Sequence, residues 1–153
     1  MESVWKYPRP PRVEANTRRL RVVYADVVIA ETTHGFRVLE TSHPPMYYFP
    51  PEDVRTEYLH LNSNHSYCEF KGRTDYYDLV VGEQVSSDAA WYYRAPSPGY
   101  QEIRDHIGFY PARVDACFVD GEQVQPQDGD YYGGWITSEI EGPFKGAPGT
   151  LRW

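Results

Sequence analysis

Apolar residues along this chain recur mainly in short runs with a period of two, which is the pattern of half-buried β-strands. Leu20, Val22 and Tyr24 follow this alternation, and a second β-rich run covers Val27–Ala30. The dipeptide Ala25-Asp26 between them predicts a tight turn. The two runs are therefore predicted to pair as a β-hairpin.

Short β-rich runs separated by turn residues continue along the chain. Further strands are predicted over Phe36–Glu40, Tyr58–Leu61, Tyr67–Phe70, Tyr76–Val81, Ala89–Tyr93, Ala116–Val119 and Glu122–Val124. The last two flank Asp120-Gly121, a dipeptide that accepts the positive φ angles of a type I′ hairpin turn. Short helices are predicted at Glu52–Arg55, which follows two prolines, and within Pro98–Asp105.

Proline and glycine set the predicted boundaries of the domain. Residues 1–18 are polar and proline-rich and are predicted to form an extended arm, because this composition buries little apolar surface. The β domain is predicted over 19–124, and the Gly- and Pro-rich residues 125–153 are predicted to pack on it as a tail. Within the domain, Ser42–Pro51 contains four prolines and is predicted to be a rigid loop rather than a central strand.

Composition supports a mainly β protein. The chain has 153 residues, the size of one domain, and it uses 14 Val and 14 Tyr against only 6 Leu. About eight short strands favour a small antiparallel barrel or sandwich with one or two short helices, and we prefer a rolled barrel because closure removes exposed edges. Rings inside such a barrel would form either a packed core or a ligand pocket.

Charge and cysteine content exclude several classes of function. A net charge of -7 gives no attraction to nucleic acid or to anionic membranes. Two distant cysteines support neither a disulfide framework nor a four-cysteine zinc site, and His60, His65 and Cys68 lack a fourth metal ligand. No metal, known cofactor motif, leader peptide or membrane span is therefore predicted, and we expect a cytoplasmic protein. Its oligomeric state is not indicated.

The loop and helix start between Glu40 and Arg55 form the first candidate site. Glu40, Tyr47, Tyr48 and Asp53 place carboxylates and phenols on a backbone stiffened by proline, as a preorganised site requires. The alternative is structural: the aromatic residues would cap the core and the acidic residues would begin a helix.

The second candidate site runs from Cys68 to Asp78 and contains Lys71 and Tyr77. On a regular strand the side chains of Cys68 and Lys71 would diverge, unless the chain bends at Gly72. A lysine beside the thiol would make Cys68 a nucleophile, whereas a cysteine among aromatic residues is commonly an inert hydrophobic residue. Lys71 is either a cationic anchor for an acidic ligand, a desolvated amine, or a solvated side chain at a strand end.

Several of these segments together resemble a bacterial family known as domain of unknown function 427, which also has a nucleotidyltransferase-like label. The resemblance rests on Glu40, His43-Pro44-Pro45, Tyr47-Tyr48-Phe49-Pro50-Pro51-Glu52-Asp53-Val54, Cys68-Glu69-Phe70-Lys71-Gly72, Ala89-Ala90-Trp91 and Phe109-Tyr110. It covers most of Leu20–Val124 and implies a β-rich domain of barrel or β-tent type. It also implies a pocket at Tyr48, Asp53, Cys68, Lys71, Tyr77 and Trp91.

Three functions follow as hypotheses. The first is a small-molecule-binding domain, or an enzyme, that takes a small anionic ligand beside Cys68 and Lys71, with Asp53 and Tyr48 as further catalytic candidates. The second is a non-catalytic module that binds a protein through its aromatic and proline residues. The third is nucleotidyl transfer, although the sequence contains neither a phosphate-binding Gly-Ser loop nor carboxylates spaced to hold Mg²⁺.

Overall fold

The strands of this protein belong to several small sheets. The structure, a computed structural model, describes residues 1–129 and 131–153. One four-stranded antiparallel sheet has the spatial order β12 (Glu122–Gln123), β11 (Ala116–Val119), β3 (Leu20–Tyr24) and β4 (Val27–Thr32). A second has the order β10 (Ile107–Phe109), β9 (Gln84–Tyr92), β8 (Gly72–Val81) and β7 (Leu59–Cys68).

Smaller elements connect and flank these two sheets. A three-stranded antiparallel sheet contains β2 (Arg12–Asn16), β5 (Gly35–Leu39) and β6 (Met46–Tyr48). Two strand pairs are β1 (Glu2–Ser3) with β15 (Ile140–Glu141) and β13 (Gln125–Pro126) with β14 (Trp135–Ile136). The helical elements are 3₁₀ turns: η1 (Val4–Lys6), η2 (Pro51–Asp53), η3 (Thr56–Tyr58), η4 (Gln101–Ile103) and η5 (Pro111–Arg113).

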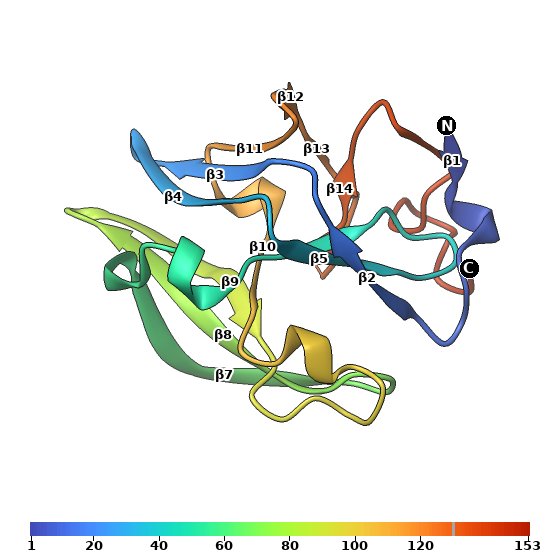
Figure 1. The fold of residues 1–153 in the computed structure, drawn as a ribbon, viewed down its shortest axis with the longest axis horizontal. Helices are drawn as coiled ribbons and strands as arrows, with labels where there is room; N and C mark the ends of the chain where they lie inside the picture. Colours follow the sequence, from blue (N-terminus) through green and yellow to red (C-terminus); the bar gives the residue numbers. More distant parts are fainter. Residues whose placement is uncertain (130) are drawn as a thin grey trace.

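The two four-stranded sheets form opposing layers with the main core between them. In Figure 1 the long strands β7, β8 and β9 lie below the β3–β4 hairpin and β11. We call the β12–β11–β3–β4 sheet the upper sheet and the β10–β9–β8–β7 sheet the lower sheet. Leu20, Val22 and Ile29 from the upper sheet share one buried cluster with Leu79 and Ala89 from the lower sheet. The mainly β prediction is confirmed. Over the described ranges the sheets stay open rather than closing into the rolled barrel that we preferred, and the arrangement loosely fits a β-sandwich.

Local sequence signals located the two hairpins of the upper sheet. In β3 the burial alternates, with Leu20, Val22 and Tyr24 facing the core. Ala25 and Asp26 have φ angles of 50° and 62°, and Asp120-Gly121 has 49° and 84°, which are the left-handed values of a type I′ turn. The predictions of these two hairpins are therefore confirmed.

Two other local predictions need correction. The predicted strands Tyr58–Leu61 and Tyr67–Phe70 fall largely within one long strand, β7, although Tyr58 belongs to η3 and Phe70 to the turn after β7. Polar residues are tolerated in β7 because it is an edge strand that is mostly exposed. The predicted loop Ser42–Pro51 contains the short strand β6. Its prolines lie on either side of β6 and so leave the hydrogen bonds to β5 intact.

The chain ends take part in the fold more fully than the sequence indicated. The predicted arm, residues 1–18, supplies β2, which pairs with β5 along its whole length, and the fully buried Val4. Trp135, in the predicted tail, lies in the main core and donates its indole N–H to the carbonyl of Phe109 at 3.1 Å. No helix among the described residues is long and apolar enough to cross a membrane.

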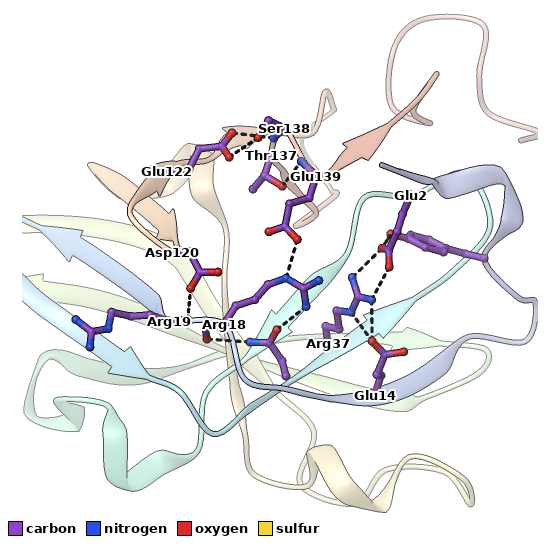
Figure 2. A network of polar contacts seen from close by, with 12 residues as sticks. Glu2, Glu14, Arg18, Arg19, Arg37, Asp120, Glu122, Thr137, Ser138 and Glu139 are labelled. Carbon is purple, nitrogen blue, oxygen red and sulfur yellow. Dashed lines mark hydrogen bonds and ion pairs between the residues drawn. The ribbon is translucent and has the colours of Figure 1, made fainter.

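A buried arginine ties the N-terminal segment to the three-stranded sheet. Figure 2 shows the Arg37 guanidinium on β5 between the carboxylates of Glu2 and Glu14. Both its terminal nitrogens donate to Glu2 at 3.0 Å, and its Nε donates to Glu14 at 2.8 Å. The Arg37 side chain is only 5% exposed, so these bonds compensate a charge that would otherwise be buried alone.

This network predicts an acid-sensitive N-terminal contact. The hydrogen bond from Arg37 holds the pKa of Glu2 at about 2, below its ordinary 4.5. The ionised Glu2 therefore contributes stability above pH 4.5, and that contribution is lost as the pH falls towards 2. We expect Glu2→Gln to lower Tm at neutral pH, and the difference from wild type to shrink in acid. Thermal unfolding at several pH values checks this; a difference that is the same at every pH would contradict it.

Candidate functional site

A cavity of about 590 Å³ lies against one face of the β7–β8–β9 sheet. Its floor is set by cross-strand register, because Ser66 on β7 pairs with Thr74 on β8, and Tyr76 on β8 pairs with Trp91 on β9. Residues directly opposite one another in an antiparallel sheet point to the same face. These four side chains line the cavity. The volume is in the range of small-molecule sites.

The turn between β7 and β8 brings Cys68 and Lys71 to this cavity together. Cys68 is the last residue of β7 and pairs with Gly72, the first residue of β8, so that Lys71 lies in the connecting turn. Gly72 has a φ of 104°, a left-handed value that glycine adopts without strain. The backbone N–H of Ser97 donates to the carbonyl of Lys71 at 2.9 Å and fixes the turn. The bend removes the divergence expected on a regular strand, and both residues line the cavity.

The ammonium of Lys71 is the most unusual group in the cavity. Lys71 is 3% exposed, yet among the described residues its Nζ has no hydrogen bond or ion pair. The ammonium lies over the Tyr93 ring, 5.9 Å from the ring centroid. Burial alone lowers the pKa of Lys71, but Tyr93, Cys68 and Glu40 outweigh it and the net pKa is raised. The side chain is therefore a buried cation at neutral pH rather than a neutral amine.

Aromatic side chains form the inner wall around Trp91. Trp91 is buried against Tyr110, with ring centroids 4.6 Å apart, and it donates its indole N–H to the hydroxyl of Tyr48 at 3.3 Å. Gly108 and Gly133 hold the indole between them: a Cβ on either would lie 2.5 Å from a ring atom. The sequence thus fixes this ring by two glycines that no larger residue can replace without movement.

His43 lines the cavity as a neutral imidazole with a defined tautomer. Burial, then the positive charges of Lys145, Lys71 and Arg9, lower the pKa of His43 to about 4. The orientation of the Gln127 amide is fixed, because its Oε1 accepts from the Gly134 N–H and its Nε2 donates to the Lys145 carbonyl. Nε2 is therefore also the donor in the 3.2 Å contact with His43 Nδ1.

The remaining proton of His43 therefore lies on Nε2, which is 3.6 Å from the Glu40 carboxylate. With the imidazole neutral, this contact is not an ion pair. Because Nδ1 already accepts a hydrogen bond, His43 has no free nitrogen to act as a general base. In this arrangement the cavity is better equipped to bind a ligand than to take a proton from one.

The cavity is locally positive although the protein is acidic overall. Among the described residues, its cationic lining side chains are Arg9, Lys71, Lys145 and Arg152, and its carboxylate side chains are Glu40 and Glu69. Within this part of the chain, four positive side chains therefore face two negative ones, in a protein whose net charge is -7. Such a concentration of one sign in a concave site raises the local concentration of the opposite ion.

Half of the predicted site residues reach this cavity. Cys68, Lys71, Glu40 and Trp91 line it. Tyr48 is fully buried directly behind Trp91, so it supports the wall rather than facing the space.

The other three predicted site residues lie elsewhere, so the residues of the implied pocket, Tyr48, Asp53, Cys68, Lys71, Tyr77 and Trp91, do not all line one space. Asp53 accepts a hydrogen bond from Thr32 at 2.7 Å, beside β4. Tyr47 packs against Trp135 in the main core, with ring centroids 5.2 Å apart. Tyr77 stacks on Tyr92 at 5.1 Å. These contacts differ from the predicted ones because Tyr47 alternates with Tyr48 along β6, and Tyr77 with Tyr76 along β8, so that each faces away from the cavity.

The outer wall comes from segments that the sequence analysis did not assign to a site. Arg9 belongs to the predicted arm, whereas Gln127, Lys145 and Arg152 belong to the predicted tail. No local pattern marks these residues, since each reaches the cavity through contacts between distant parts of the chain. The 84-residue separation of His43 and Gln127 is an example.

Comparison with known families gives one match. Residues 12–120, more than half of the chain, match the model of a family described as domain of unknown function DUF427, with the label NTP_transf_9. No curated protein matches the chain. The matched range includes Cys68, Lys71 and Trp91, whereas Arg9, Lys145 and Arg152 lie outside it.

Proposed function

The chain belongs to the DUF427 family, for which no activity is described, and on that premise we propose that it binds a small organic anion in the Lys71 cavity. Lys71 anchors the anionic group, and the wall around Trp91 accepts the apolar part of the ligand. The cavity volume of about 590 Å³ suits a molecule of one or two rings.

The observation that carries this proposal is the unpartnered ammonium of Lys71. Buried charges in proteins are normally paired or hydrogen-bonded, because desolvation of a lone charge is costly. Lys71 lines an open space and has no such partner among the described residues. A carboxylate or phosphate entering that space supplies the missing charge-assisted hydrogen bond.

The two competing functions have less support. Nucleotidyl transfer needs carboxylates that hold Mg²⁺ beside the phosphates. No group of three His, Cys, Asp or Glu side chains in the described part of the chain is arranged to hold a metal ion, so the proposal does not include that reaction. A protein-binding module would use exposed rings such as Tyr67 and Tyr131, but such a role leaves the buried ammonium of Lys71 unexplained.

Isothermal titration with benzoate and with its neutral analogue benzyl alcohol tests the proposal. We expect wild-type protein to bind benzoate at least about tenfold more tightly than benzyl alcohol, and Lys71→Met to lose that preference. Lys6→Met, an exposed lysine away from the cavity, is the matched control and keeps the preference. Equal affinity for the two compounds in wild type, or an unchanged preference in Lys71→Met, would overturn the proposal.

A further inference from the structure

We infer that the ligand carries two anionic groups on a flat body, one bound by Lys71 inside the cavity and the other by Lys145 and Arg152 nearer its mouth. This inference rests on the proposed function and names the class of ligand: a small aromatic dianion. It assigns the second group to residues outside the range matched by the family model.

The cations of the cavity are distributed from the inside outwards. Lys71 is buried, Lys145 is half-buried, and Arg9 and Arg152 are exposed, yet all four line the same space. Lys145, Lys71 and Arg9 all act on the buried ring of His43, and each lowers its pKa. These three charges therefore act within one cavity, although Arg9 and Lys145 belong to the two end segments of the chain and Lys71 to its middle.

Most of this positive charge lacks a carboxylate partner. Arg9 lies 3.5 Å from Glu40 and also donates to the Thr41 carbonyl at 2.9 Å. Lys71, Lys145 and Arg152 have no ion pair among the described residues, and the Lys145 ammonium lies over the Tyr132 ring, 5.9 Å from the ring centroid. One anionic group would compensate Lys71 but would leave the outer cations unpaired.

Aromatic rings line the same cavity as the two sets of cations. Inside, Trp91, Tyr93 and Tyr110 are buried. Farther out, Tyr67 and Tyr131 line the same cavity while remaining 74% and 88% exposed. Exposed rings at the edge of a concave site are suited to cover a planar apolar body. A flat molecule with an acidic group at each end matches a lining in which cations and rings occur both inside the cavity and nearer its mouth.

Titration with aromatic acids that differ only in their second charged group tests this inference. Benzoate is compared with phthalate, isophthalate and terephthalate, and phenylacetate with para-phenylenediacetate, all at constant ionic strength. We expect at least one dianion to bind about five- to tenfold more tightly than its monoanion, beyond the roughly twofold statistical advantage of two equivalent groups. The geometry of the preferred dianion then reports the spacing of the two cationic positions.

Variants separate this inference from the proposed function. Lys145→Met with Arg152→Gln is expected to reduce the preference for the dianion to about the statistical twofold. Lys6→Met with Arg104→Gln removes the same charge away from the cavity and is expected to keep the preference. If benzoate binds and depends on Lys71 but no dianion binds more than about twofold better, the two-anion inference is wrong and the proposed function stands. If no monoanion or dianion depends on Lys71, the proposed function itself fails.

Discussion

Replacing Lys71 by methionine is expected to raise the free energy of unfolding of the ligand-free protein by about 1–3 kcal/mol. Methionine has a similar length, fills the same space and needs no hydrogen-bond partner. The wild-type lysine, in contrast, is 3% exposed, and its ammonium has no such partner among the described residues. Binding sites commonly retain groups of this kind at a cost in stability, and removing them stabilises the fold while abolishing function.

The surroundings of Lys71 determine the sign of this expected change. Tyr93, Cys68 and Glu40 raise the pKa of Lys71 against the effect of burial. Of these, only Glu40 is a carboxylate, whereas Tyr93 and Cys68 attract the ammonium as full charges only in their deprotonated forms. Glu40 also lies 3.5 Å from Arg9 and so is shared between two cations. Glu40 is therefore the one carboxylate among these three groups that offsets the desolvation cost of Lys71.

Urea unfolding at neutral pH measures this effect. The exposed Lys6→Met variant is the matched control and should stay within about 0.5 kcal/mol of wild type. If Lys71→Met instead lowers the free energy of unfolding by more than about 1 kcal/mol, Lys71 supports the fold and is not held there for a ligand.

Replacing Gly108 by alanine is expected to lower the free energy of unfolding by about 1–3 kcal/mol. The added Cβ would lie 2.5 Å from Trp91 Cζ2 and 2.7 Å from Cε2. Movement of the indole is restricted, because Gly133 packs on it as well and its N–H is bonded to Tyr48. The strain must therefore be taken up by the inner wall of the cavity, and the affinity for benzoate should fall with the stability.

A double-mutant cycle identifies Trp91 as the source of this cost. Phenylalanine lacks the second ring of the indole, so Gly108→Ala should be less damaging in a Trp91→Phe background than in wild type. Equal costs in the two backgrounds, or a fully stable Gly108→Ala variant, would show that the indole is not confined in this way.

Sequence patterns predicted those parts of the protein that depend on neighbouring residues. The alternation of Leu20, Val22 and Tyr24 and the Asp120-Gly121 turn indicated the upper sheet, because strand period and turn geometry are local properties. Cys68 and Lys71 were also found as a pair. Their convergence depended on Gly72, whose turn conformation reverses the chain immediately after Lys71.

The outer half of the site could not be predicted because it depends on long-range contacts. Arg9 and Lys145 lie in segments whose composition indicates an arm and a tail. Buried side chains such as Val4 and Trp135 nevertheless fix those segments to the domain. Asp53 and Tyr77 show the converse case: both lie in chemically rich segments, but Asp53 bonds to Thr32 and Tyr77 stacks on Tyr92. The sequence identifies segments rich in reactive side chains, but the direction in which each side chain points depends on the fold.

The rates at which iodoacetate and iodoacetamide alkylate Cys68 test the positive cavity most directly, because the thiol lies inside it and no ligand needs to be known. Mass spectrometry distinguishes Cys68 from Cys117, which is buried in the core. The anionic reagent should be favoured in the folded protein by about fivefold relative to the same thiol in urea, and Lys71→Met should remove that preference. The overall charge of -7 alone would make the ratio of the iodoacetate rate to the iodoacetamide rate equal or lower in the folded protein than in urea. That result would contradict an anion-binding cavity at Lys71.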